Sequence, residues 1–246
     1  MPAAKIFTGI RLIHINRSER LIVSFLILLF FAFPDFVTGG DYRSFSAYKT
    51  SDRELTNNNI DYTLIESAII HFTNLERNKF NLTLCVPDNR LKQASYRHSR
   101  EMVRLQYFSH RSPVAKNREL LDRLKQTNFT MSNIIVAENI GVDYLLRIAK
   151  RPFYTSYRDG KLRYIDAGTH QVIGFQTHIE FARDMVQQWM NSPAHRKNIL
   201  NPKFNLIGVG IAKGPYQDVQ ALYVTQNFCG PLTPTPEKAS ASAVNN

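Results

Sequence analysis

The sequence predicts one domain of mixed helices and strands. Several stretches space their apolar residues three and four positions apart, as amphipathic helices do, and others are short runs of β-prone residues. At 246 residues the chain is long enough to bury the core of one large domain and to carry additional segments at its ends.

An apolar run from Leu21 to Val37 follows four basic residues, Lys5, Arg11, Arg17 and Arg20. Its uninterrupted core, Leu21 to Phe33, has the length of the apolar region of a signal peptide and is short for a membrane-spanning helix. We therefore interpret residues 1–40 as a signal peptide, with an uncleaved anchor as the alternative. Either interpretation places the domain in a secreted, periplasmic or cell-surface location, in contact with a membrane only through the anchor.

The formal net charge is +11, and residues 41–246 keep a net charge of +9 because they hold 27 basic and 18 acidic residues. These charges are scattered and form no block of five or more Lys and Arg residues. We therefore expect no nucleic-acid partner, and favour attraction to anionic cell surfaces or polymers. The oligomeric state is not predicted.

Residues 41–59 are polar and read as a linker. Residues 60–79 carry a helical apolar stripe, and a second stripe from Leu91 to Leu105 follows a break and cap at Pro87-Asp88-Asn89. A short helix is predicted over residues 117–126, with Leu120, Leu121 and Leu124 inward. Ile134 to Ala137 is a β-prone run that would deliver Glu138 at its end.

Residues 142–175 are less regular and are interpreted as an insertion that contains a hairpin, because Asp159-Gly160 separates two β-prone runs. Residues 177–191 resume helical spacing, with Trp189 expected in the core. Two strands are predicted over residues 206–212 and 221–228, and a disordered tail over 231–246. The domain thus spans residues 60–230.

Cys85 and Cys229 lie near the two ends of this domain. In an oxidising compartment they would form a disulfide that closes most of the domain into a loop. The alternative is a pair of free structural thiols.

Residues 188–200 (QWMNSPAHRKNIL) read as the end of one helix, an N-cap Ser192, Pro193 at the first helical position, and a second short helix. His195 lies in the first turn of that helix. The unpaired N–H groups there would lower the pKa of its imidazole, and a neutral imidazole can bind a metal or accept a proton.

Six motifs in order resemble the CAP superfamily, also called SCP domains (cysteine-rich secretory protein, antigen 5, pathogenesis-related 1), in its bacterial form. They are TNLER (73–77), YFSHRSP (107–113), AENI (137–140), WMNSPAHRKNIL (189–200), FNLIGVG (204–210) and YVTQNF (223–228). The resemblance implies an α+β fold, a three-layer α-β-α sandwich with an antiparallel central sheet.

The resemblance also implies a surface cleft in which His110, Glu138 and His195 converge. Many eukaryotic relatives have a second acidic residue near the position of Asn191 or Ser192, and this chain lacks it. Two imidazoles would suit a divalent ion, zinc best, with His110 and His195 as its ligands. Glu138 would either join them or orient one imidazole.

We favour an exported binding module for a lipid, peptide or cell-surface ligand. The alternative is a metal-assisted, peptidase-like hydrolase with His110, Glu138 and His195 as catalytic residues. A serine hydrolase is disfavoured, because no Gly-x-Ser-x-Gly motif occurs. The remaining helical histidines, His71 and His98, and the pair His170 and His178 near the insertion are interpreted as solvated or hydrogen-bonded residues.

Overall fold

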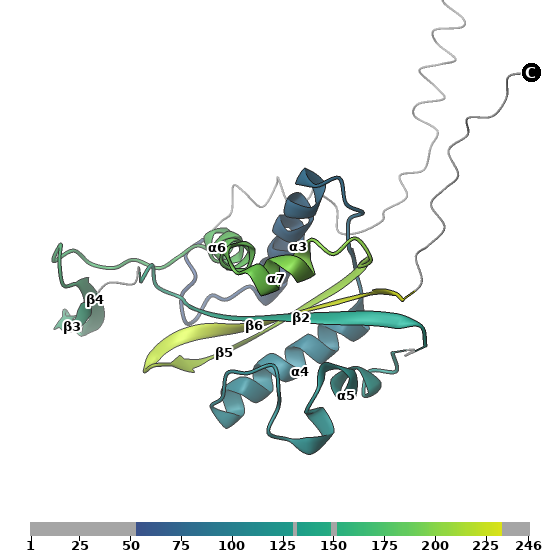
Figure 1. The fold of residues 1–246 in the computed structure, drawn as a ribbon. Helices are drawn as coiled ribbons and strands as arrows, with labels where there is room; N and C mark the ends of the chain where they lie inside the picture. Colours follow the sequence, from purple (N-terminus) through teal and green to yellow (C-terminus); the bar gives the residue numbers. More distant parts are fainter. Residues whose placement is uncertain (1–52, 130–131, 149–151, 233–246) are drawn as a thin grey trace, which may run out of the picture. The chain divides into compact units, whose positions relative to one another are not determined.

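The computed structural model describes residues 53–129, 132–148 and 152–232. In this part of the chain a four-stranded sheet lies between two layers of helices (Figure 1), which is the predicted α+β sandwich. The predicted signal segment, most of the linker and nearly all of the predicted tail lie outside the described residues. The elements are α3 (Tyr62–Lys79), β1 (Val86–Pro87), α4 (Asn89–Leu105), the 3-10 turn η1 (Ala115–Asn117), α5 (Leu120–Lys125), β2 (Ile134–Tyr144), β3 (Phe153–Arg158), β4 (Lys161–Asp166), α6 (His178–Asn191), α7 (Pro193–Ile199), β5 (Leu206–Tyr216) and β6 (Val219–Pro231).

The three long helices begin at side chains that satisfy their first backbone N–H groups. Asp61 accepts from the N–H of Leu64 at the start of α3, and Asp88 accepts from two N–H groups at the start of α4. Thr177 and Glu180 form a capping box at the start of α6. The helices predicted from apolar spacing therefore form close to the predicted bounds.

The sheet has the strand order β1-β5-β6-β2. β5 and β6 pair antiparallel, as do β6 and β2, whereas the two-residue strand β1 pairs parallel with Leu206 and Ile207 of β5. The predicted antiparallel sheet is confirmed apart from this short parallel strand. β2 lies at one edge of the sheet, where segments from both helical layers can approach it.

Each face of the sheet packs against its own helices. α3, α6 and α7 cover one face, and α4 and α5 cover the other (Figure 1). Trp189 is 2% exposed in the larger core, as predicted, and its indole N–H donates to the carbonyl oxygen of Ile140 at 3.0 Å. On the opposite face, Gly208 and Gly210 let the backbone of α4 approach β5 closely.

Two local predictions were wrong. Strand β2 continues through Glu138 to Tyr144, so Glu138 lies in mid-strand opposite Asn227 of β6 instead of at a strand end. The strand continues because its pairing with β6 runs on past Glu138 as far as Tyr144 opposite Ala221. Leu121 of α5 is 43% exposed, and the inward position is taken by Arg123, which is 2% exposed.

The predicted hairpin within the insertion is confirmed. β3 and β4 pair from Phe153 opposite Asp166 to Arg158 opposite Lys161, and the left-handed conformations of Asp159 and Gly160 form its turn. An isolated antiparallel β-bridge between Leu146 and Phe175 joins the segment that leads into the hairpin to the segment that leaves it. Residues 142–144 belong to β2, so the non-core part of the insertion begins after Tyr144.

Cys85 and Cys229 are free, buried thiols, so the prediction of a disulfide between them was wrong. They lie on opposite faces of the sheet. Cys85 packs into the core under α3 and α6, whereas Cys229 packs against Leu91 and Leu124 on the α4 side. A bridge would have to pass through the sheet, which the short reach of a disulfide does not allow.

Candidate functional site

The loop that carries His110 follows α4 and is fixed from within the protein. Its anchor is the buried carboxylate of Glu101, which accepts hydrogen bonds from Tyr107, Ser112 and Asn117. These three donors lower the pKa of Glu101 although burial, the largest influence, opposes them. The loop therefore has a defined path with His110 at its outer bend, where the His110 side chain is 52% exposed.

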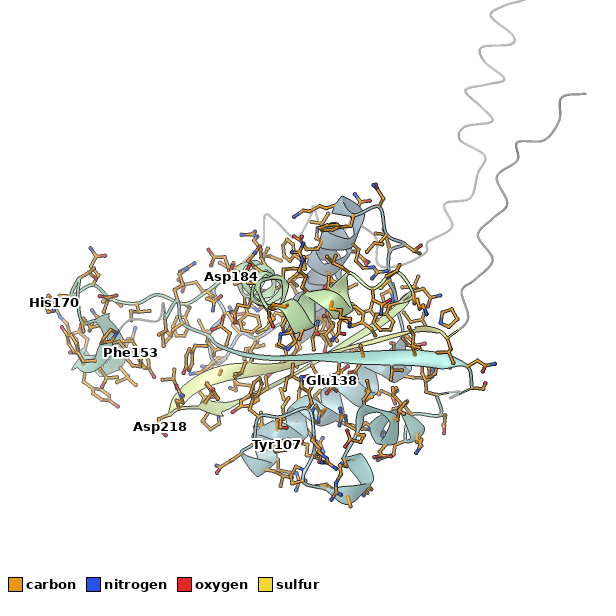
Figure 2. The ribbon with its side chains drawn as sticks, in the orientation of Figure 1. Tyr107, Glu138, Phe153, His170, Asp184 and Asp218 are labelled. Atoms are coloured by element: carbon orange, nitrogen blue, oxygen red, sulfur yellow. The ribbon has the colours of Figure 1, made fainter. Side chains whose placement is uncertain are left out.

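Glu138 lies near the middle of edge strand β2, and its side chain is only 6% exposed (Figure 2). One carboxylate oxygen lies 3.0 Å from Nδ1 of His110, and the other accepts from Nη2 of Arg123 at 2.5 Å. Burial opposes ionisation, but the His110 hydrogen bond and the charge of Arg123 outweigh it and lower the pKa of Glu138. Glu138 is therefore an ionised carboxylate with both oxygens engaged.

Arg123 joins this carboxylate to the His110 loop. Its Nη1 donates to the carbonyl oxygens of Asn117 at 3.0 Å and His110 at 3.3 Å, while its Nη2 holds Glu138. No feature of the sequence singled out this residue, since an arginine on a short helix is usually solvated. The side chain is buried because the facing strand supplies a carboxylate that pairs with it.

His98 is a second imidazole beside the same carboxylate. It is fully buried on α4. Its Nε2 lies 3.1 Å from the carbonyl oxygen of Ser109 and 3.8 Å from Oε1 of Glu138. The sequence interpretation as a hydrogen-bonded helix residue holds, but its position next to Glu138 was not predicted. The sequence feature that indicates its burial is the place of His98 on the apolar stripe of α4.

His195 reaches the site from the opposite helical layer. Asn198 of α7 donates to the side-chain oxygen of Asn139 at 2.9 Å and to the backbone oxygen of Glu138 at 3.2 Å, so α7 is held against the edge of β2. The rings of His110 and His195 lie 6.3 Å apart between centroids. The structure thus brings together all three residues that the sequence singled out, around the edge strand.

The pKa of His195 is lowered chiefly by burial, with a contribution from His110. This differs from the predicted cause, a helix N-terminus. Ser192 occupies the N-cap position of α7, but its side chain makes no capping hydrogen bond. At the position of the missing second acid, Asn191 accepts a hydrogen bond from Gln187.

The other two histidines near the insertion lie away from these contacts. His178 is 2% exposed and ties α6 to the preceding segment, because its Nε2 accepts from the N–H of Asp61 and its Nδ1 contacts the carbonyl oxygen of Arg53. His170 lies in the hairpin region near Tyr154 (Figure 2). Both fit the predicted interpretation as hydrogen-bonded or solvated residues.

The donor set does not fit a firmly held zinc ion. Protein zinc sites use three or four side-chain ligands, whereas this site offers the two predicted imidazoles, His110 and His195, and a carboxylate already engaged by Arg123. Within the described residues, no group of three or more His, Cys, Asp or Glu side chains is arranged to hold a metal ion. Glu138 instead has the geometry of a residue that orients an imidazole.

A mostly antiparallel sheet between two helical layers, with one histidine from each layer meeting at the edge strand, defines an SCP-type α-β-α domain. The model of the cysteine-rich secretory protein family (CAP) matches residues 70–228. The chain therefore belongs to this family.

Two curated relatives come from Bacillus subtilis (strain 168). The uncharacterized protein YkwD is 29% identical over 67% of this chain and 47% of its own length, and the uncharacterized membrane protein YlbC is 27% identical over 68% and 34%. The chain thus spans about half or less of these relatives.

Among solved structures, an extracellular SCP-domain protein from Bacillus anthracis is 27% identical, with a TM-score of 0.43 over 67% of this chain and 39% of that one. An outer surface protein from Borrelia burgdorferi is 13% identical, with a TM-score of 0.44 over 70% of this chain and 96% of that one. In the described part of this chain, no helix is both long and apolar enough to span a bilayer.

Acidification is expected to destabilise the domain through His98. Burial lowers the pKa of His98 to about 4, whereas an unfolded histidine titrates near 6.5. Between these values the unfolded chain binds a proton that the folded domain refuses, so stability falls as the pH falls. His98 alone should remove about 2 kcal/mol of unfolding free energy between pH 7 and pH 5.

Urea unfolding at the two pH values measures this loss. The variant His98→Gln keeps a hydrogen-bond donor but does not titrate, so its loss should be smaller than that of the parent by about 2 kcal/mol. The matched variant His170→Gln, in the hairpin region, should behave as the parent does. An equal pH dependence in all three proteins would contradict the assignment.

Proposed function

We propose that this chain is an exported CAP-domain binding module, in which His110 and His195 hold a small lipid, peptide or cell-surface ligand. The observation that supports binding over hydrolysis is the state of Glu138. Each of its oxygens already has a partner, Arg123 for one and His110 for the other, and its lowered pKa makes it a weak base, so it is poorly suited to activate a water molecule.

The imidazole pair is suited to polar recognition of a ligand. When Nδ1 of His110 donates to Glu138, the opposite ring nitrogen of a neutral imidazole is left as an acceptor facing away from that carboxylate. The lowered pKa of His195 favours a neutral ring at that residue. The two rings therefore offer hydrogen bonds to a polar group.

An exposed aromatic residue on the same loop supports an amphiphilic ligand. Phe108 precedes His110 by two residues, is 42% exposed, and lies edge-on against Tyr216 and Tyr223. A ligand whose polar end contacts the histidines could place an apolar part on this ring. Export is supported by the predicted signal segment.

The test compares small molecules that copurify with the parent protein and with the double variant His110→Ala/His195→Ala. Mass spectrometry of the extracts should identify a species that the parent carries and the double variant lacks. The control His170→Ala removes a histidine distant in the fold and should retain the species. If all three extracts contain the same species, the ligand does not bind at the histidine pair and the proposal is wrong.

Incubation with a pooled peptide and ester library tests the competing hydrolase function. We expect no turnover by the parent protein. Turnover that the parent shows and the double variant loses would overturn the proposal in favour of a hydrolase.

A further inference from the structure

A hollow of about 340 Å³ lies between α4 and residues 114–126, and neither His110 nor His195 lines it. Its wall carries four exposed basic side chains, Arg97, Arg100, Arg104 and Lys116. The three arginines recur at steps of three and four residues, so they share one face of α4. The positive charge of this chain is scattered along its sequence, but the fold gathers part of it in this hollow.

These four cations are not neutralised by the described part of the protein. Other basic residues of the domain, such as Arg90, Lys92 and Lys125, form ion pairs with carboxylates, whereas none of the four does. Arg97 donates to the carbonyl oxygen of Gln126, and the guanidinium of Arg100 lies over the ring of Tyr96 at 5.9 Å. Such contacts place the side chains but leave their charge available.

One carboxylate, that of Glu101, also lines the hollow. It is 7% exposed, and Tyr107, Ser112 and Asn117 already donate to it. Arg123 on the same wall is matched by Glu138. After these charges are counted, the wall still has a clear surplus of positive charge.

Arg123 supplies an independent observation. It is 2% exposed, and Nη1 and Nη2 are hydrogen-bonded, but its Nε has no partner. A buried charged donor without an acceptor is unfavourable, and such groups are rare in folded proteins. Arg123 lines the hollow, and a movement of its side chain toward an oxyanion bound there would give this buried nitrogen an acceptor.

We propose that this hollow binds the phosphate group of an anionic ligand. Guanidinium groups match phosphate oxygens with paired hydrogen bonds, and three arginines from one helix face can surround a single group. The volume suits a small headgroup and is at the lower end of the range for ligand pockets. Neither His110 nor His195 lines the hollow, so the proposal does not rest on the function proposed for the histidine pair, although Glu101 and Arg123 also hold the His110 loop.

Calorimetric titration with inorganic pyrophosphate tests the site. The parent should bind, and the variant Arg97→Gln/Arg104→Gln should bind at least about tenfold more weakly, because two charged donors are lost. The control Arg158→Gln/Lys161→Gln removes the same charge from the exposed hairpin and should bind as the parent does. No binding by the parent, or an equal loss in both variants, would overturn the proposal.

A spectroscopic measurement follows the unpartnered nitrogen directly. The Nε–H resonance of Arg123, assigned by its disappearance in Arg123→Lys, should shift as pyrophosphate is added to the parent protein. A resonance that stays in place at saturation would contradict the assignment of Arg123 to the site. The variant His110→Ala/His195→Ala should retain pyrophosphate binding, so failure of this proposal and failure of the proposed function are distinguishable.

The phosphate could belong to a soluble molecule or to a lipid headgroup. Vesicles of phosphatidylcholine with and without phosphatidylglycerol separate these sources. Binding only to the vesicles that contain phosphatidylglycerol, reversed by pyrophosphate, assigns the site to a lipid headgroup. Pyrophosphate binding without vesicle binding assigns it to a soluble phosphate compound.

Discussion

Replacement of Arg77 by methionine is expected to lower the free energy of unfolding by about 3 to 5 kcal/mol, the largest effect predicted for a single site here. Arg77 is fully buried near the end of α3. Its guanidinium donates to the carbonyl oxygens of Thr83, Ile199, Asn201 and Phe204 at 2.6 to 2.9 Å.

The size of this effect follows from what the substitution leaves behind. The four acceptors belong to three segments, the loop after α3, the end of α7 and the approach to β5, so a single side chain holds these segments together. Methionine fills most of the volume but donates no hydrogen bond. Buried carbonyl groups would then lack partners, and each would carry its own desolvation cost.

Urea unfolding at pH 7 measures the change. Arg77→Lys should show an intermediate loss, because an ammonium group retains the charge but cannot span acceptors on opposite sides. Lys79→Met, two residues later and 63% exposed at its side chain, should change stability by less than about 0.5 kcal/mol. A loss below about 1 kcal/mol for Arg77→Met would show that the carbonyl groups find other donors.

The second large effect is expected for Gly210→Ala, which should cost about 3 kcal/mol or more. A Cβ atom at Gly210 would lie 2.0 Å from the backbone nitrogen of Tyr96 and 2.4 Å from its Cα. Both atoms belong to the backbone of α4, so no side-chain rotation relieves the clash. The helix must move away from β5, which also stretches the hydrogen bond of 2.9 Å from Ser99 to the carbonyl oxygen of Gly210.

Thermal unfolding followed by circular dichroism measures this loss. Gly168→Ala is the matched control, because a Cβ there meets only the side chain of Asp166 at 3.4 Å, which is an ordinary contact. This control should change stability by less than about 0.5 kcal/mol. Equal melting temperatures for the two variants would mean that α4 and β5 separate more easily than their packing implies.

Local patterns were sufficient to predict the helices but not the full strands. The apolar stripes and caps of α3, α4 and α6 depend on residues within one or two turns, so they can be read from the sequence. β5 and β6 extend beyond their predicted ends to Tyr216 and Pro231, because pairing with a neighbouring strand continues after the β-prone run has ended. That pairing is a property of the fold and has no local signal.

The candidate site was predicted in part. His110, Glu138 and His195 could be selected because their motifs occur in order, and the structure places them together. Arg123 and His98 were missed as partners of Glu138, since their burial depends on α4 and α5 packing against β2. A residue pattern shows which side chains are present, but contacts between distant segments arise only when the layers assemble.

The two buried thiols bear on the conditions under which this protein can fold. Cys85 and Cys229 are the only cysteines of the chain, and burial raises the pKa of each to about 11, which keeps them in the unreactive thiol form. The native domain therefore needs no thiol oxidase or disulfide isomerase to fold. Its covalent structure is the same in a reducing and in an oxidising environment. Only a chain that has lost its tertiary structure exposes these sulfurs, so disulfide-linked dimers formed under oxidising conditions would report unfolding.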